Sequence, residues 1–157
     1  MSINVVPAKI IDIDSIECIA QQCFDKFKLS NLGLEYLKED VIKKMNQFIN
    51  NENFLFLKAI FDGEIVGFSI CAITDTLYSF SQKQITEFAM QSLPILSQSF
   101  QSKVILSLIQ NIESYADNNN ISLCAFSICP NFDIGSNLSK KGYVLSDKVF
   151  LKNMEVK

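Results

Sequence analysis

The sequence predicts a single α/β domain with a mixed central sheet flanked by helices. Segments with apolar residues at helical spacing alternate along the chain with short apolar runs that are typical of strands. Asp62-Gly63 stands between two such runs, and this pair favours a type I′ hairpin because glycine readily adopts positive φ. Between residues 85 and 129 a strand, a helix and a strand follow in order, which indicates parallel strands joined by a crossover helix. A chain of 157 residues can bury a sizeable core in one domain.

A strand is expected over residues 3–8, followed by two helices. Asp14-Ser15 offers an N-cap for the first helix. Its apolar stripe consists of Ile16, Ile19, Ala20, Cys23 and Phe27. A polar break at residues 30–33 precedes the second helix. The apolar stripe of that helix consists of Leu34, Leu37, Val41, Met45 and Phe48. The strands of the hairpin are then expected over residues 54–61 and 65–74.

The second half of the chain contains the strand–helix–strand unit. Polar residues 75–84 are expected to connect the hairpin to a strand over residues 85–93. The apolar face of the next helix consists of Val104, Ile105, Leu108, Ile112, Tyr115 and Ala116. Three asparagines at positions 118–120 end it. The remaining elements are a strand, a short helix and a last strand, over residues 121–129, 134–141 and 144–154.

The charged residues exclude some classes of function. The chain has 14 basic and 17 acidic residues, every basic residue is lysine, and histidine is absent. Without arginine the usual bidentate contacts to phosphate and guanine are missing, so we do not expect a nucleic-acid-binding protein. Without histidine the commonest general base and zinc ligand are missing, so acid–base chemistry must come from Asp, Glu, Tyr, Cys, Lys or water.

The five cysteines, at positions 18, 23, 71, 124 and 129, favour buried reduced thiols over catalysis or metal binding. Their number is odd, no C-x-x-C occurs, and their surroundings are apolar. A nucleophilic cysteine would also need a basic partner such as histidine. We therefore expect no metal site.

No membrane segment is expected. The longest apolar runs, such as residues 54–57 and 65–73, are too short or too interrupted to cross a bilayer. The N-terminus lacks a basic segment followed by an apolar one, the pattern of a signal peptide. The expected location is therefore the cytoplasm.

A polar loop at the start of the third helix is a candidate anion site. The strand over residues 85–93 leads through Pro94 into Ser97-Gln98-Ser99-Phe100-Gln101-Ser102-Lys103. The first N–H groups of a helix have no internal partners, and the helix dipole favours negative charge there. The alternative interpretation is an ordinary serine-capped helix start.

These elements, in this order, resemble the GNAT-type acyl-CoA N-acyltransferases. In that family the third helix usually follows Pro, two residues, Arg or Gln, and G-x-G-x-G/A. Alignment on Pro94 places Ser97 at the Arg/Gln position and Gln98, Phe100 and Ser102 at the three small positions, where only Ser102 is small. A second family pattern, N-x-x-A-x-x-L-Y-x-K-x-G-F, is matched in part by Asn131, Lys140, Gly142 and Tyr143; Ile134, Asn137 and Leu138 replace its Ala, Leu and Tyr. Residues 149–152 resemble the last strand of the family.

The resemblance implies transfer of an acetyl group from acetyl-CoA to a primary amine of a small molecule or a peptide. A homodimer is a further expectation from this resemblance. The residues that it implies for cofactor binding are Ser92, Leu93, Ser97, Gln98, Ser99, Phe100, Gln101, Ser102, Lys103 and Asn131. Phe100 would place a ring where main chain should approach pyrophosphate. Leu138 removes the hydroxyl that acts as general acid in the family, a role that water could fill.

Glu87 is the candidate general base, because family members often carry a glutamate on this strand. Strand alternation predicts that Glu87, Ala89 and Gln91 share one face of the sheet. Partial burial would raise the pKa of its carboxyl group. A solvated glutamate at a strand start is the alternative, and Tyr36 and Tyr78 are weaker candidates for the base.

A second function remains open at this point. The missing glycines and the missing tyrosine also fit a GNAT-like domain that has lost catalysis and acts as a binding or assembly module.

Overall fold

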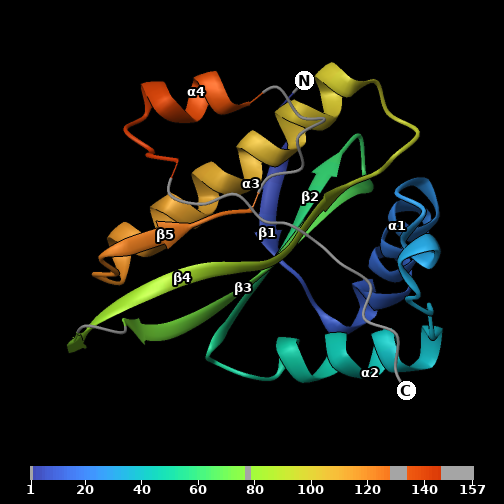
Figure 1. Ribbon diagram of the computed structural model, residues 1–157, viewed down its shortest axis with the longest axis horizontal. Helices are drawn as coiled ribbons and strands as arrows, with labels where there is room; N and C mark the ends of the chain where they lie inside the picture. Colours follow the sequence, from blue (N-terminus) through green and yellow to red (C-terminus); the bar gives the residue numbers. More distant parts are fainter. Residues whose placement is uncertain (1, 77–78, 128–133, 146–157) are drawn as a thin grey trace.

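The computed structural model describes residues 2–76, 79–127 and 134–145. Its centre is a five-stranded sheet in the spatial order β1-β2-β3-β4-β5 (Figure 1). The strands are β1 (Asn4–Pro7), β2 (Phe54–Phe61), β3 (Glu64–Thr76), β4 (Ser79–Ser92) and β5 (Leu123–Ala125). The first four strands pair in antiparallel fashion, and β5 pairs with β4 in parallel. The mixed sheet is thus confirmed.

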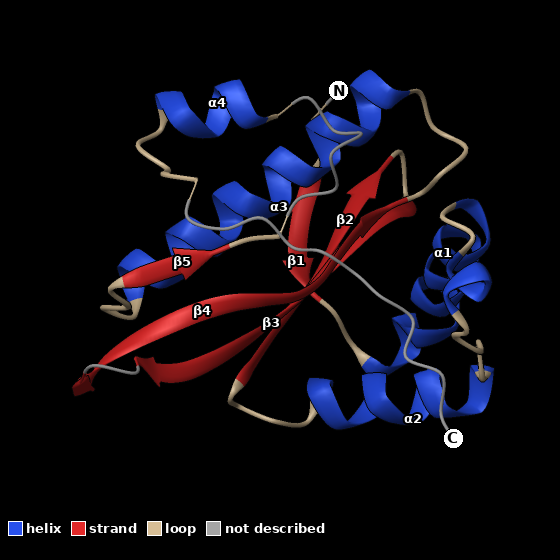
Figure 2. Cartoon of the chain, in the orientation of Figure 1, coloured by secondary structure: helices blue, strands red, loops and turns tan. Residues whose placement is uncertain are grey.

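Helices cover both faces of the sheet (Figure 2). They are α1 (Ile13–Lys26), α2 (Lys38–Ile49), α3 (Gln98–Asn118) and α4 (Gly135–Lys140), with short 3-10 turns η1 (Ile10–Asp12) and η2 (Leu29–Leu32). One apolar cluster joins α1 and α2 to one face, and the other joins α3 and α4 to the opposite face. The helix α3 connects β4 to β5, so the predicted crossover is confirmed.

Local backbone conformations agree with two of the turns read from the sequence. Asp62 and Gly63 have φ values of 51° and 86°, and two positive values in succession are those of a type I′ turn. Ser97 is the N-cap of α3, and its hydroxyl accepts a hydrogen bond from the Phe100 N–H.

The predicted starts of α1 and α2 were wrong. Asp12, not Asp14-Ser15, precedes α1, and its carboxylate accepts the Lys9 N–H and pairs with Lys58 Nζ at 2.6 Å. Leu34 and Leu37 precede α2 and are more than half exposed. Tyr36 lies between these two leucines in the sequence, and its hydroxyl donates to the Glu17 carboxylate. This hydrogen bond connects residues 34–37 to α1.

Most of the polar segment 75–84 belongs to strands, because β3 extends to Thr76 and β4 begins at Ser79, while residues 77–78 lie outside the described part. The two strands form a ribbon whose side chains in this part of β4 are mainly exposed. Asp75 pairs with Lys83 across the ribbon, so opposite charges face one another. Polar composition here indicated solvent exposure rather than a break in the strand.

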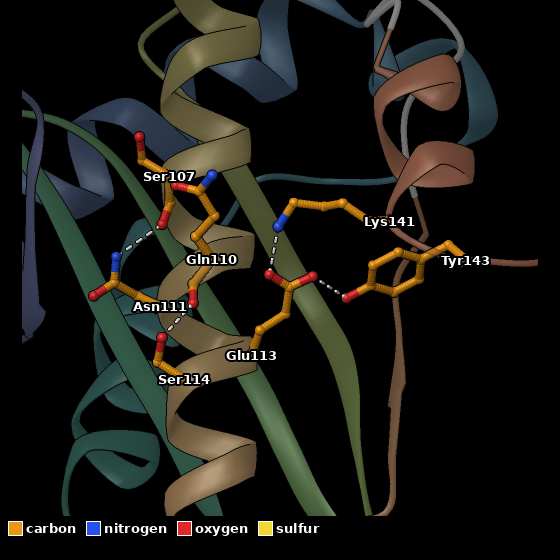
Figure 3. A network of polar contacts seen from close by, with 7 residues as sticks. All are labelled: Ser107, Gln110, Asn111, Glu113, Ser114, Lys141 and Tyr143. Atoms are coloured by element: carbon orange, nitrogen blue, oxygen red, sulfur yellow. Dashed lines mark hydrogen bonds and ion pairs between the residues drawn. The ribbon is translucent and has the colours of Figure 1, made fainter.

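Helix α4 is fixed to α3 through one carboxylate (Figure 3). Glu113 binds Lys141 Nζ at 2.6 Å and accepts a hydrogen bond from the Tyr143 hydroxyl at 2.9 Å. The Tyr143 ring also contacts Phe126, just beyond β5. Gly142 precedes it with a φ of 90°, which explains the glycine at this position. Leu138 is buried in the core beneath α4.

The last two predicted strands are only partly described. β5 covers Leu123–Ala125 within the predicted residues 121–129, and residues 128–129 lie outside the described part. Val144 and Leu145 are exposed and belong to no strand, and the rest of the predicted strand over residues 144–154 lies outside the described residues.

No helix in the described ranges is both long and apolar enough to cross a membrane.

Candidate functional site

A bulge in β4 is the irregularity on which the candidate site is built. Cys71 on β3 pairs with Glu87, and Ile70 pairs with Ala89, so Phe88 is an extra residue on β4. Residues paired across a sheet share a face. Glu87 therefore lies on the face of Cys71 and α3, whereas Ala89 lies on the face of Ile70 and α1. The predicted common face for Glu87, Ala89 and Gln91 was wrong, because the bulge shifts the alternation by one residue.

The two parallel strands separate next to this bulge. The β4–β5 ladder ends at the pair Thr86 and Ala125. Beyond it, the Ser127 N–H donates to the Glu87 carboxylate at 3.0 Å instead of to a main-chain oxygen of β4. In Figure 1, β4 continues past the end of β5 toward α1. The Glu87 carboxylate thus stands in the opening between the strands.

The pKa of the Glu87 carboxyl group is raised above its ordinary value. Partial burial disfavours the charged form, and the main-chain N–H groups of Ser127 and Met90 oppose this effect by donating to the carboxylate. A carboxylate with a raised pKa that lines a cleft has the properties of a general base.

The cleft beside β4 has a volume of about 260 Å³ and is open to solvent on one side. Its floor is the stretch of β4 from Glu87 to Ser92. One wall comes from the end of α1, and the other comes from the turn into α3 and from the segment after β5. The lining residues are Cys23, Lys26, Phe27, Glu87, Phe88, Ala89, Met90, Gln91, Ser92, Pro94, Gln101 and Ser127. This size suits a small molecule or the end of a longer one.

Two polar atoms of β4 in this cleft have no hydrogen-bond partner among the residues described. They are Ser92 Oγ and Gln91 Oε1, both buried. Ser92 as a whole is only 3% exposed. A buried polar atom without a partner costs free energy, so such atoms in a cleft indicate where a polar ligand can bind.

The turn into α3 uses its polar groups internally. Gln101 is 4% exposed, and its Nε2 donates to the carbonyl oxygens of Pro94 and Leu96. The Phe100 ring packs edge-on against Phe61 with centroids 4.8 Å apart, so it does not narrow the cleft. Ser97 caps the helix, as described above. These contacts favour the alternative interpretation of the loop, a serine-capped helix start.

The structure brings together three of the predicted site residues in the cleft: Glu87, Ser92 and Gln101. The others described are not lining residues: Leu93, Ser97, Gln98, Ser99, Phe100, Ser102 and Lys103. Asn131 lies outside the described residues. Ser97, Gln98, Ser99 and Lys103 are exposed at the start of α3, and an anion could still contact them there.

The weaker candidates for the base do not lie in the cleft. The Tyr36 hydroxyl donates to Glu17, its ring packs against Phe24, and burial raises the pKa of its phenol. Tyr78 lies outside the described residues.

Cys23 and Cys71 are buried free thiols, as predicted, whereas Cys124 is half-buried and Cys18 is exposed. Cys129 lies outside the described residues. Burial raises the pKa of Cys23 to about 11 and that of Cys71 to about 12, so both remain thiols at neutral pH. Within the described ranges, no group of three or more potential metal ligands occurs.

Sequence reasoning missed Lys26, which reaches the cleft from the end of α1. Its Nζ is 3.5 Å from both the Pro94 carbonyl oxygen and Gln101 Oε1. Nothing in the local sequence distinguishes Lys26 from Lys28, and both side chains are exposed. Only the packing of α1 beside β4 places one of them at the cleft.

No family model and no curated protein matches this sequence. Solved structures do match it over nearly the whole chain. A GNAT family acetyltransferase from Staphylococcus aureus subsp. aureus USA300_TCH1516 has a TM-score of 0.64 and 17% identity, covering 98% of this chain and 100% of the other. A predicted acetyltransferase with acetyl-CoA from Clostridium acetobutylicum has a TM-score of 0.67 and 16% identity, covering 96% of each chain.

A third similar structure is an aminoglycoside acetyltransferase, meta-AAC0020, from an uncultured soil metagenomic sample in complex with sisomicin. Its TM-score is 0.67 and its identity 11%, covering 99% of this chain and 97% of the other. At these identities the likeness concerns the fold, and that fold is shared with the GNAT acetyltransferases.

Proposed function

We propose that this chain, whose fold is that of the GNAT acetyltransferases, is an N-acetyltransferase that uses acetyl-CoA and a primary amine. The observation that carries the proposal is the opening between β4 and β5, with Glu87 at the bulge. A shared fold does not by itself establish an activity, which depends on the chemical groups in this cleft.

Glu87 is proposed as the general base. Its carboxylate takes a proton from the acceptor ammonium, directly or through a water, and leaves a neutral amine. The raised pKa makes this carboxylate a better proton acceptor than an exposed one. The amine nitrogen then forms a bond to the thioester carbonyl carbon, the carbon–sulfur bond breaks, and the nitrogen gives its second proton to the departing thiolate or to water. The thiolate of CoA leaves as such or takes a proton from water, because the pKa of a thiol is about 8.5.

The free part of β4 is proposed to hold the thioester end of acetyl-CoA. Beyond Thr86 the described ladder with β5 has ended, so the outward main-chain groups of Met90 and Ser92 are next to the cleft. The Met90 N–H, which donates to Glu87, is a candidate donor to the thioester oxygen. The buried Gln91 Oε1 fits a ligand that contains amide N–H groups, and acetyl-CoA is such a ligand.

The first test is calorimetric titration with acetyl-CoA, with adenosine 3′,5′-bisphosphate as the control ligand. Micromolar binding of acetyl-CoA supports the proposal, and thiol release in the presence of amines then tests turnover. Ligand at about a hundredfold excess over Kd should also raise the free energy of unfolding by about 2.7 kcal/mol.

Failure to bind at millimolar concentration would contradict the proposal. The chain would then be better described as a GNAT-like binding or assembly module. The internal use of Ser97, Phe100 and Gln101 at the start of α3 is the observation that favours this second function.

A further inference from the structure

We propose that the acceptor is a small amino acid-like molecule, in which the amine and a carboxylate belong to the same compound. Glu87 would face the amine and Lys26 would bind the carboxylate. This inference rests on the proposed function, and it names the substrate class of the same cleft.

The charges of the cleft carry the first part of the argument. Among the described residues that line it, only Lys26 and Glu87 are charged, and their charges are opposite. The other ten are apolar or neutral polar side chains. A ligand with one positive and one negative group complements such a site, whereas a polycation would meet a lysine in the same small space.

Lys26 is free to accept an anionic partner. Its two hydrogen bonds, to the Pro94 carbonyl and to Gln101 Oε1, are long at 3.5 Å and involve neutral oxygens, and its Nζ also lies 5.9 Å from the centre of the Phe27 ring. No carboxylate lies within 4.0 Å of Lys26 Nζ among the described residues. By contrast, three other described lysines form ion pairs with a carboxylate: Lys38, Lys58 and Lys141. A charge-assisted hydrogen bond to a ligand carboxylate is therefore available to Lys26.

Gln101 is the side chain that positions Lys26. Gln101 is buried, and its Nε2 is held by the carbonyl oxygens of Pro94 and Leu96. Its Oε1 consequently faces the Lys26 ammonium. Gln101 is thus a positioning residue that keeps the ammonium at the wall of the cleft.

The unpartnered atoms on the floor are an independent second observation. Ser92 is 3% exposed and lines the cleft, and its Oγ has no hydrogen-bond partner among the described residues. Its hydroxyl can donate to a carboxylate oxygen. Gln91 Oε1, also buried and unpartnered, can accept from an ammonium or amide N–H. Ser92 lies on the Glu87 face of β4 and Gln91 on the opposite face, so Ser92 provides the polar group for an acceptor beside Glu87.

The size of the cleft limits the acceptor. A volume of about 260 Å³ suits a small molecule. A free amino acid is such a molecule. The N-terminus of a protein presents its carboxylate only at the far end of the chain, so it lacks the nearby negative group that Lys26 requires.

The test compares acceptors in matched pairs that differ only in the carboxylate. Glycine with glycinamide and β-alanine with β-alaninamide are suitable pairs, supplied with acetyl-CoA and followed by thiol release and by mass detection of the acetylated product. The expected kcat/KM is about tenfold to a hundredfold higher for the acid in at least one pair, the range of a hydrogen bond to a charged group.

Lys26→Met should remove this preference by raising KM for the acid, with little change for the amide. The matched control is Lys43→Met, on the exposed side of α2 away from the cleft, and it should keep the preference. Equal rates for acid and amide in the wild-type protein would overturn the inference. An increase of KM for acetyl-CoA instead of for the acceptor in Lys26→Met would overturn it as well.

A separate binding measurement distinguishes this inference from the proposed function. If acetyl-CoA binds but no amine releases thiol, or if acetyl-CoA does not bind, the same acids and amides are titrated calorimetrically into the wild-type and Lys26→Met proteins. Binding of the acids that depends on Lys26 supports the amino acid site although the acetyltransferase proposal has failed. Absence of such binding overturns the inference.

Discussion

The turn into α3 and the cleft beside β4 are adjacent, and they differ in how much of their hydrogen-bonding capacity the protein itself uses. In the turn, Ser97 caps the helix and Gln101 holds two carbonyl groups. In the cleft, Ser92 Oγ and Gln91 Oε1 have no partner within the described residues. Both regions are rich in polar side chains, so polarity alone does not separate a binding site from a structural turn. What separates them is whether the polar atoms are already satisfied.

The comparison assigns a structural role to the turn and a ligand-binding role to the cleft. It can be tested by substitutions in each region that distinguish loss of stability from loss of activity.

Glu87→Gln should have the largest effect, because it removes the only carboxylate that lines the cleft in the described part of the chain. We expect kcat/KM to fall by about 10²–10⁴-fold, the usual contribution of a general base, with acetyl-CoA binding retained. Steady-state thiol release measures the first quantity and calorimetry the second. The control is Glu64→Gln, an exposed residue of the β2–β3 hairpin, which should leave both unchanged. An active Glu87→Gln variant would show that Glu87 is not the base.

The same residue predicts two pH dependences of opposite sign. The base must be deprotonated, so kcat/KM should fall as pH decreases through the raised pKa of Glu87. In the folded state this carboxyl binds its proton more tightly than in the unfolded state. Its contribution to the free energy of unfolding should therefore be greatest at low pH and decline as pH rises from the ordinary pKa through the raised one. Thermal unfolding of wild type and Glu87→Gln between pH 4 and 8 measures this decline, which the variant should lack.

Gln101→Leu should destabilise the protein by about 1–3 kcal/mol, because the carbonyl groups of Pro94 and Leu96 lose their donor. Denaturant unfolding gives this value. Gln110→Leu, the same change on the exposed side of α3, is the control and should change stability by about 0.5 kcal/mol or less. If both variants were equally stable, Gln101 would not support the turn.

Ser97→Ala should cost about 1 kcal/mol through loss of the helix cap and leave kcat/KM unchanged in the folded enzyme. Ser99→Ala, two positions further and exposed, is the control for stability. A rise in KM for acetyl-CoA in Ser97→Ala, without loss of stability, would indicate that this turn binds the cofactor.

Ser92→Ala should have the smallest effect on stability, within about 0.5 kcal/mol, because the removed hydroxyl has no partner in the described structure. Ligand binding should nevertheless weaken several-fold. Ser69→Ala is a close control, since Ser69 is equally buried with an unpartnered hydroxyl but does not line the cleft. Equal kinetics in the two variants would contradict a ligand-binding role for Ser92.

The sequence by itself predicted the mixed sheet, the Asp62-Gly63 hairpin and the crossover helix α3, and it offered a serine-capped start of that helix as an alternative to an anion site. Each depends on local patterns: apolar spacing, turn residues and a capping hydroxyl act within a few residues of one another. It also singled out Glu87, but through a family resemblance and not through its surroundings.

Only the tertiary structure decided the composition of the cleft. The extra residue Phe88 becomes visible when β4 is paired with β3, and it moves Ala89 and Gln91 to the face opposite Glu87. Lys26 reaches the cleft because α1 packs beside β4. Its contact there, the Pro94 carbonyl, is 68 residues further along the chain. Strand register and helix packing are set by contacts between distant segments, and a pattern within one segment carries no information about which distant segment will lie beside it.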